Sequence, residues 1–345
     1  MTRIYLIRHA EAEGNIYRRL HGQYNARLTP NGLRQVAALE ARFRGVPIDA
    51  VYTSDLCRTR QTAEAICRPK GLTAILDPRF REVGVGPWEN RTFGDLARTE
   101  PEALEDFLRR PEKWAVAGAE AYPDYAERFS EGLRSAAAAN EGKTIAVFSH
   151  GCVISGGLHR LLGIPHDASK CDNTGVSLLR WEGGKFTAES LYDNAHLSEG
   201  LSTRARQRWW RQQGGRFELW FRNAEASDRA WFDPGFLPQE GHALRVAMLG
   251  DQAVGYVGWH RDVISLIWLK PEYRHRRMGD QLLGEAVMRL RKDGKQSLSI
   301  GIPTANVEAL SFFSRHGAAL EQMDDVYTAY RWDIRVPYPI PDEKS

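Results

Sequence analysis

Arginine and histidine side chains follow several short apolar runs in this sequence. Arg8 and His9 come directly after the run Ile4 to Ile7, and Arg58 and His150 each follow a later run of the same kind. Such runs indicate buried strands, and the carboxyl ends of parallel strands meet at one edge of a sheet. Guanidinium groups bind a phosphoryl group with bidentate geometry, and a neutral imidazole can attack phosphorus to form a phosphohistidine. The pattern therefore predicts phosphoryl chemistry in one crevice.

These residues, in this order, resemble the histidine phosphatase superfamily, with its phosphoglycerate-mutase-like fold, over approximately residues 1 to 195. The family signature is Arg-His-Gly, and Ala10 stands here in place of the glycine. The resemblance implies that His9 is the phosphorylated nucleophile and that Glu82, in the segment Arg81 to Glu89, is the general acid. It further implies a catalytic role for His150. The residues implied to line the phosphate are Arg8, Asn15, Arg58 and His150.

The chemistry explains why an acid is expected beside the nucleophile. An alkoxide leaves poorly, so a carboxyl group with a raised pKa would protonate it before water attacks. An isolated glutamate is more often a solvated loop carboxylate, but the position of Glu82 in the matched segment favours the acid. The interval from Glu89 to Ala146 is short, whereas the mutases of the family typically carry a longer insertion there. We therefore expect a phosphatase that acts on a small-molecule phosphate ester without a cofactor, with a phosphoglycerate-type mutase as the alternative.

A second group of residues lies in the C-terminal part of the chain. Residues 269 to 283 run from a strand through a basic turn into a helix, whose N-terminus favours phosphate binding. Together with residues 306 to 317, this order resembles the GNAT N-acetyltransferases over approximately residues 216 to 335. The resemblance implies acetyl-CoA as cofactor, with its pyrophosphate on the amides of residues 276 to 280, and an unknown amine as acceptor. The implied cofactor-binding residues are Leu269, Arg274, Arg276, Arg277, Met278, Gly279, Asp280, Asn306 and Phe313.

Two of these positions depart from the family pattern. Arg277 stands where the first glycine belongs, although glycine allows the backbone to approach the phosphates closely. The charge of Arg277 is expected to compensate. Phe313 stands where the family often carries a tyrosine that protonates the departing thiolate, and Tyr327 or Tyr330 would have to replace it. The alternative is a phosphatase with a non-catalytic GNAT-like module that binds acyl-CoA.

The stretch from Leu201 to Arg216 contains five arginines, two tryptophans (Trp209 and Trp210) and no acidic residue. One interpretation is a patch for phosphate or nucleic acid. The other is a basic linker, or a helix that packs its tryptophans between two domains. The net charge of the chain is only +3, which is small for a dedicated nucleic-acid binder, so we favour the second interpretation and expect no nucleic-acid partner.

Length and composition are consistent with two globular domains. The chain has 345 residues, and a domain usually has about 100 to 200. Hydrophobic residues make up 42% and charged residues 26%, which excludes a disordered or collagen-like chain. The sequence has no long apolar segment, so we expect a cytoplasmic protein without a membrane partner. The four cysteines lack the spacing of a zinc site or a disulfide framework, so no metal is expected. Nothing in the sequence indicates the oligomeric state.

Hydrophobic periodicity predicts an α/β N-terminal part whose sheet is covered on both faces, followed by a separate C-terminal α+β unit. The two resemblances imply that these are a phosphoglycerate-mutase-like three-layer α/β/α domain and a GNAT-like α+β domain. The expected N-terminal strands are 4–7, 49–53, 144–148, 176–180 and 186–192, and the helices 33–43, 58–66, 104–114, 122–139 and 152–162. The expected C-terminal strands are 217–222, 243–249, 254–260, 263–269, 297–302 and 326–334, and the helices 277–291 and 306–316. The expected division is residues 1–200 and 216–336 as domains, 201–215 as basic linker and 337–345 as disordered tail.

Overall fold

The N-terminal domain is built on a six-stranded sheet in the order β3-β2-β4-β1-β5-β6. The computed structural model describes residues 1–214, 217–232 and 241–339. The strands of this first sheet are β1 (Thr2–Arg8), β2 (Ala50–Thr53), β3 (Ile75–Leu76), β4 (Thr144–Ser149), β5 (Val176–Glu182) and β6 (Lys185–Asp193). β1 and β2 both run parallel to β4, whereas β5 and β6 form the expected antiparallel hairpin.

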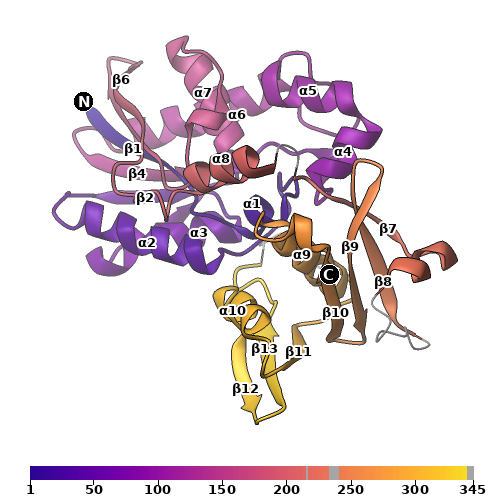
Figure 1. Cartoon of the computed structure of the whole chain (residues 1–345). Coiled ribbons are helices and arrows are strands. Elements are labelled where there is room, and N and C mark those ends of the chain that lie inside the picture. Colours follow the sequence, from indigo (N-terminus) through magenta and orange to yellow (C-terminus); the bar gives the residue numbers. More distant parts are fainter. Residues whose placement is uncertain (215–216, 233–240, 340–345) are drawn as a thin grey trace.

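Helices cover both faces of this sheet, which confirms the three-layer arrangement (Figure 1). The helices of the domain are α1 (Glu13–Tyr17), α2 (Pro30–Phe43), α3 (Cys57–Lys70), α4 (Phe93–Thr99), α5 (Pro101–Arg109), α6 (Tyr122–Ala138) and α7 (Gly151–Leu162). α2 and α3 pack with Ile7 and Phe148 on one face, and α6 and α7 pack with Ile4 and Leu6 on the other. α5 ends earlier than expected, at Arg109. Arg110 precedes Pro111, and helical geometry is disfavoured for a residue that precedes a proline.

The C-terminal domain contains a seven-stranded sheet in the order β12-β13-β11-β10-β9-β8-β7. Its strands are β7 (Trp220–Asn223), β8 (Ala243–Leu249), β9 (Gln252–His260), β10 (Val263–Leu269), β11 (Ser297–Pro303), β12 (Ala319–Met323) and β13 (Tyr327–Asp333). The expected antiparallel meander of β8, β9 and β10 is confirmed. β7 begins later than predicted, and the edge strand β12 was not predicted. Among its described residues, the helices of eight or more residues are α9 (Met278–Lys292) and α10 (Val307–Arg315).

The strands β10 and β11 pair at two positions only. They run parallel, and their two paired positions are Val263 with Ser299 and Ile264 with Ile300. Beyond Ile264 the two strands separate, although both continue for several residues. A sheet that opens in this way leaves backbone and side chains of β10 accessible from between the strands. The opening is therefore a place where the fold itself provides room for a ligand.

The expected basic linker is a helix over most of its length, α8 (Thr203–Gly214). Its start is fixed because the hydroxyl of Ser202 accepts a hydrogen bond from the amide of Ala205 at 3.0 Å, and Gln35 donates to the carbonyl of Leu201 at 2.7 Å. Trp209 is 49% exposed, so its ring is not buried between the domains. The side chain of Trp210 lies outside the described residues.

The two domains share a hydrophobic core through α1. Tyr17 is 1% exposed and belongs to the cluster formed by α9 and the second sheet. Gly284 of α9 allows this contact, since a Cβ at that position would lie 2.4 Å from the ring of Tyr17. Figure 1 shows α1 between the two sheets, next to α9. The expected separate C-terminal unit is therefore continuous with the N-terminal domain.

Ion pairs reinforce this interface. Arg291 of α9 donates to both carboxylate oxygens of Glu13 at 2.9 Å. Arg19 pairs with the buried Glu285 of α9, which also pairs with two arginines of the C-terminal domain. Burial by itself raises the pKa of Glu285, but these arginines outweigh it, and the pKa lies below its usual value. The interface is thus fixed by paired charges as well as by apolar packing.

The described part of the C-terminal tail lies against the N-terminal domain. Asn25 donates a hydrogen bond to the carbonyl of Tyr338 at 2.7 Å, and the guanidinium of Arg60 lies 4.3 Å from the centre of the Tyr338 ring. The expectation of a disordered tail is therefore wrong at Tyr338, and residues 340–345 lie outside the described part. No helix among the described residues is long and apolar enough to cross a membrane.

Candidate functional site

The parallel pairing of β1 and β4 brings two histidines together. Arg8 is opposite Ser149 in the register, and the amide of His9 donates to the carbonyl of Ser149 at 2.9 Å. The residues that follow the two strands, His9 and His150, have ring centres 5.2 Å apart. Arg58 reaches the same place from the first turn of α3. The sequence-based expectation that these residues meet at one sheet edge is therefore confirmed by the geometry.

The hydrogen bonds of His150 define its tautomer. Its Nδ1 lies 3.0 Å from Nε of Arg58, and a guanidinium can only donate, so Nδ1 accepts. The proton of the neutral ring therefore lies on Nε2, which donates to the hydroxyl of Ser54 at 3.0 Å. Burial, followed by the charge of Arg58, lowers the pKa of His150 well below its usual value. His150 is thus a neutral imidazole held between an arginine and a serine.

His9 is oriented in the opposite sense. Its Nδ1 lies 2.7 Å from the carbonyl oxygen of Ala10, which can only accept, so Nδ1 carries the proton. The lone pair is then on Nε2, the other ring nitrogen. Burial, followed by the charges of Arg58 and Arg8, lowers the pKa of His9 well below its usual value. Ala10 supplies this carbonyl from its backbone, so the loss of the family glycine leaves the contact intact.

These lowered pKa values predict that stability falls in mild acid. His9 and His150 are buried, and His21 is partly buried. The pKa of each lies below the usual 6.5, so the folded state keeps them neutral while the unfolded chain takes up protons. We expect the free energy of unfolding to decrease as the pH falls below 6.5, by up to about 1.4 kcal/mol per pH unit for each histidine. Urea unfolding at about pH 7 and about pH 5.5 measures this. Equal stability at both values would contradict the buried neutral state.

The three predicted phosphate ligands lie around His9 with different partners. Arg8 donates to the carbonyl of Cys171, and Oδ1 of Asn15 accepts from the amide of Ala12 at 2.9 Å. Arg58 is 2% exposed and donates to the carbonyls of Gly22 at 2.7 Å and Tyr24 at 2.9 Å. Burial lowers the pKa of Arg58 to about 10, so it remains cationic at neutral pH.

The carboxylate of Glu82 lies at the N-terminus of α7, the helix that begins directly after His150. One carboxylate oxygen accepts from the amide of Val153 and the other from the amide of Cys152, both at 3.1 Å. Free amides at a helix N-terminus favour such a carboxylate. The residue is only partly buried, unlike the two histidines. The structure therefore brings all six predicted residues of this site into one region.

Two further residues of this region were not predicted. Ser54 holds His150, as described above. Asn173, in the loop before β5, donates from its side chain to the carbonyl of His9 at 2.9 Å and lies 3.5 Å from Oδ1 of Asn15. Ser54 follows β2 directly, so its place at the end of a strand was a usable signal. The loop that carries Asn173 precedes a strand, and nothing in its sequence marks it.

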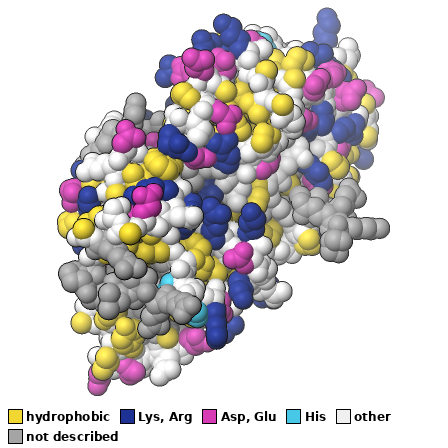
Figure 2. Space-filling model, turned by 90° about the vertical axis from the view of Figure 1, so that its right-hand side faces the viewer, with side chains coloured by type: hydrophobic (Ala, Val, Ile, Leu, Met, Phe, Trp, Pro, Cys, Tyr) yellow, Lys and Arg dark blue, Asp and Glu magenta, His cyan; other side chains and the backbone are white. Residues whose placement is uncertain are grey.

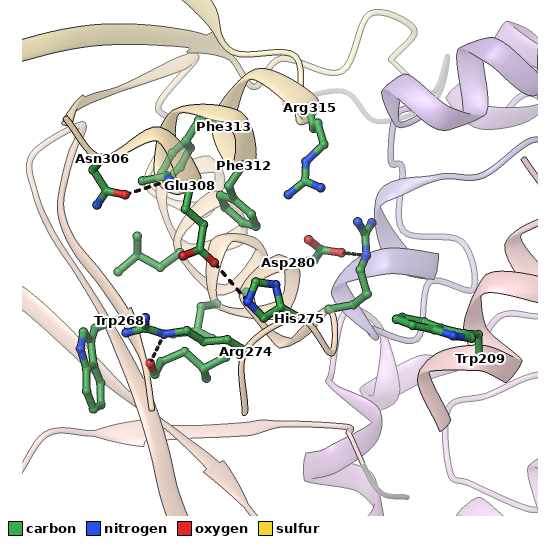
Figure 3. A pocket seen from close by; sticks show the side chains of 16 residues that line it. Trp209, Trp268, Arg274, His275, Asp280, Asn306, Glu308, Phe312, Phe313 and Arg315 are labelled. Carbon is green, nitrogen blue, oxygen red and sulfur yellow. Dashed lines mark hydrogen bonds and ion pairs between the residues drawn. The ribbon is translucent and has the colours of Figure 1, made fainter. Parts of the chain in front are cut away.

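The second site lies beside the C-terminal end of β10. A cavity of about 510 Å³ opens there, beside the N-terminus of α9 and along α10, and no residue of β11 lines it (Figure 3). Of the nine predicted cofactor residues, seven line it, namely Leu269, Arg274, Arg277, Gly279, Asp280, Asn306 and Phe313. Arg276 is not among its lining residues, and Met278 is fully buried in the core. Other lining residues, not predicted, include Trp268, His275, Glu308, Phe312 and Arg315.

Arg277 occupies the position of the family glycine in the conformation that a glycine would adopt. Its φ is +62°, in the left-handed region, and it precedes the first residue of α9. Its Nε lies 2.6 Å from the carboxylate of Asp280, which is 2% exposed and also contacts His316 at 3.1 Å. Burial by itself raises the pKa of Asp280, but Arg277 and His316 outweigh it, and the pKa is lowered. The charge of Arg277 is therefore largely balanced within the protein, which weakens the expected compensation.

The helix α8 contributes to the wall of this cavity. Trp209 lines it from the opposite side to Phe312 and Arg315 of α10, as Figure 3 shows. Phe313 is 1% exposed and offers no hydroxyl. Neither Tyr327 nor Tyr330 is among the lining residues of this cavity.

Comparisons with known proteins agree with this geometry. The model of the histidine phosphatase superfamily (branch 1) matches residues 4–194, and that of the acetyltransferase (GNAT) family matches residues 204–318. A Yersinia pestis protein named "Probable phosphoglycerate mutase GpmB" is 32% identical over 205 residues, which cover 57% of this chain and 95% of that protein.

Solved structures with the same N-terminal fold include two at 28% sequence identity. YhfR of Bacillus stearothermophilus superposes with a TM-score of 0.55 over 57% of this chain and 100% of its own. Phosphoserine phosphatase of Entamoeba histolytica, in complex with 3-phosphoglyceric acid, superposes with a TM-score of 0.51 over the same shares. The chain therefore belongs to the histidine phosphatase superfamily, and it carries a GNAT acetyltransferase domain behind its phosphatase-like domain.

Proposed function

We propose that the N-terminal domain hydrolyses phosphate monoesters through a phosphohistidine on His9. The observation that carries this proposal is the orientation of His9, whose Nδ1 is bonded to the carbonyl of Ala10, so that the lone pair lies on Nε2. A buried neutral imidazole with a fixed tautomer is suited to nucleophilic attack. The cationic groups of Arg8 and Arg58 lie beside it and suit a phosphoryl group. Phosphatases and a mutase among the relatives are consistent with this chemistry.

The reaction would proceed in two steps. Nε2 of His9 attacks phosphorus, the bond from phosphorus to the ester oxygen breaks, and a protonated Glu82 gives its proton to the departing alkoxide. Glu82 then takes a proton from water, whose oxygen attacks the phosphohistidine and releases inorganic phosphate. His150, with Nε2–H held by Ser54, and the two arginines would stabilise the charge on the phosphoryl oxygens.

Trapping the intermediate tests this proposal directly. The chain is mixed with a phosphate ester, quenched at alkaline pH, where phosphohistidine survives, and digested for mass spectrometry. We expect one phosphoryl group on the peptide that contains His9. Turnover without any phosphorylated peptide, or with the phosphoryl group elsewhere, would exclude His9 as the nucleophile.

The proposed acid predicts a dependence on the leaving group. We expect Glu82→Gln to lower kcat for alkyl phosphates by about 100-fold or more, because an alkoxide needs a proton. The loss should be much smaller for p-nitrophenyl phosphate, whose leaving group needs little protonation. The measurement is kcat for both substrate types in the variant and the wild type. Equal losses on both would remove Glu82 from the role of acid.

A phosphoglycerate-type mutase is the second candidate, favoured by the similarity to GpmB. A mutase transfers the phosphoryl group from the histidine to a second hydroxyl, whereas a phosphatase transfers it to water. Incubation with 3-phosphoglycerate separates the two, since a phosphatase releases inorganic phosphate and a mutase forms 2-phosphoglycerate. The short interval from Glu89 to Ala146 supports the phosphatase.

For the C-terminal domain we propose acetyl-CoA binding in the cavity beside β10, α9 and α10, and acetyl transfer to an amine. Bound acetyl-CoA would supply an activated acetyl thioester. The residues of the cavity suit this ligand, because residues at the N-terminus of α9 line it and Arg274 and Arg315 add positive charge. Trp209 and Phe312 add aromatic surface.

Isothermal titration with acetyl-CoA, followed by an amine screen, tests this second proposal. Micromolar binding with transfer to any amine would support an acetyltransferase. Binding without transfer would favour the alternative, a GNAT-like module that binds acyl-CoA without catalysis. The absence of a hydroxyl at Phe313 is consistent with this alternative. No binding would overturn both.

A further inference from the structure

The helix α8 lies outside the segment that matches the phosphatase family, yet it forms one wall of a cavity beside the N-terminal site. The cavity measures about 550 Å³. Arg8 and Asn15 line it, together with Asn173, whose side chain contacts the carbonyl of His9. The residues of α8 that line it are Thr203, Arg204, Gln207, Arg208 and Gln212. The cavity is therefore shared by two of the proposed phosphate ligands and α8.

The chemistry of this cavity is polar and positively charged. Its charged lining residues are three arginines, Arg8, Arg204 and Arg208, and one acidic residue, Asp172. Asp172 is 3% exposed, and its carboxylate accepts four hydrogen bonds, including those from the Ser202 hydroxyl at 2.5 Å and the Arg204 amide at 3.1 Å. The hydrogen bonds from Ser202 and Arg204 thus use the Asp172 carboxylate to hold the start of α8. None of the described residues that line the cavity is aromatic, so these residues offer no matching surface to an apolar leaving group.

The two arginines of α8 are free to bind an anion. The side chains of Arg204 and Arg208 are both exposed, and neither forms an ion pair within the part of the chain that the structure describes. They are one helical turn apart, so they lie on the same face of α8. The neighbouring Trp209 lines the cavity of the C-terminal domain instead. Figure 2 shows several Lys and Arg side chains gathered near the middle of one face of the molecule.

The backbone that carries these arginines is fixed against the N-terminal domain. Thr203 donates from its hydroxyl to the buried carboxylate of Glu11 at 2.9 Å and accepts from Gln35 at 3.0 Å. Gln207 donates to the carbonyl of Asn15 at 3.2 Å, so α8 contacts α1 beside a proposed phosphate ligand. The guanidinium groups are therefore presented to the cavity from a positioned helix, which limits the entropy lost on binding.

We propose that Arg204 and Arg208 form a second anion site, so that the substrate is a phosphate ester whose leaving group itself carries a carboxylate or a second phosphoryl group. This inference rests on the proposed phosphatase function, because it assigns the leaving-group side of that site. The phosphoryl group that reacts lies at His9, and the second anion lies along α8. An inter-domain helix thereby selects the substrate of the N-terminal domain.

Matched pairs of esters test this selection. 3-Phosphoglycerate differs from glycerol 3-phosphate by a carboxylate, and glucose 1,6-bisphosphate differs from glucose 6-phosphate by a phosphoryl group. We expect the wild type to prefer the more anionic member of at least one pair in kcat/KM. The double variant Arg204→Gln/Arg208→Gln should reduce that preference by about tenfold or more, as expected for the loss of charge-assisted hydrogen bonds. The pair that responds identifies the anion.

The control is Arg44→Gln, an exposed arginine at the end of α2 with the same change of charge. It should leave both preferences unchanged, which excludes an effect of net charge alone. The absence of any preference in the wild type, or an unchanged preference in the double variant, would overturn the second anion site.

A binding experiment separates this inference from the proposed function. Isothermal titration of 3-phosphoglycerate and glucose 1,6-bisphosphate into His9→Ala, with and without the two α8 substitutions, needs no turnover. Weaker binding after the substitutions would support the anion site even if no ester is hydrolysed, a result that would count against the phosphatase alone. If the wild type hydrolyses p-nitrophenyl phosphate but the two α8 substitutions leave binding unchanged, the phosphatase function would stand and the anion site would be excluded.

Discussion

His9→Ala is expected to lower kcat for p-nitrophenyl phosphate by about 1000-fold or more, because loss of a covalent nucleophile removes the two-step pathway. The same variant should bind acetyl-CoA with unchanged affinity. His9 lies at the end of β1 with its ring towards His150, and it is not among the residues that line the cavity of the C-terminal domain. Steady-state kinetics and isothermal titration on one preparation provide both measurements.

A matched control for this experiment is His159→Ala. His159 is in the last turn of α7 and is exposed, with Nδ1 at 2.6 Å from the carbonyl of Ile164. It should retain wild-type turnover. If His9→Ala kept more than a tenth of the activity, the phosphohistidine at this position would be excluded. If acetyl-CoA binding were lost as well, the variant would have disturbed the fold, and circular dichroism would detect this.

The chemistry of the N-terminal site was predictable because it depends on local order in the sequence. Apolar runs predicted β1 and β4, and parallel pairing places the residues after them at the same edge. The hydrogen-bond partners were not predictable. The contact of His9 with the carbonyl of Ala10 and that of His150 with Ser54 depend on side-chain rotamers and on the path of two loops, which sequence periodicity does not encode.

The elements that the sequence did not reveal are those that derive their stability from tertiary contacts. α1 has five residues, too few to be stable alone, and it forms because Ile16 and Tyr17 are buried against α9. α8 is rich in arginine and lacks an apolar stripe, so its pattern left open whether the segment is a linker or a helix. The network around Glu11 and Asp172 holds its first turn, and those residues are distant in the sequence.

Within the C-terminal domain, the strand-to-helix turn was predicted, but its electrostatics were not. The resemblance placed Arg277 next to the cofactor as a compensating charge. Its pairing with Asp280 depends on the burial of that carboxylate and on His316, which approaches from the end of α10. Asp280 and His316 thus accommodate the arginine at position 277, although the family pattern does not relate these two residues to each other.

The shared core predicts that the two domains unfold together and that Tyr17→Ala destabilises both. Truncation of a buried aromatic ring costs about 3 to 5 kcal/mol, and Tyr17 is 1% exposed between α1 and α9. Unfolding in urea is followed by two probes, residual hydrolysis of p-nitrophenyl phosphate and intrinsic tryptophan fluorescence. In the wild type, the two transitions should coincide. In Tyr17→Ala, both midpoints should shift to lower urea concentration.

Two further variants make this experiment specific. Tyr17→Phe keeps the ring and should retain most of the stability. Tyr125→Ala removes a ring that is 2% exposed within the core of the N-terminal domain, at a distance from the interface, and so tests whether a defect in one domain reaches the other. If the domains are coupled, Tyr125→Ala also shifts both probes. Two separate transitions in the wild type, with Tyr17→Ala affecting only one, would show that the α1–α9 contact does not join the domains energetically.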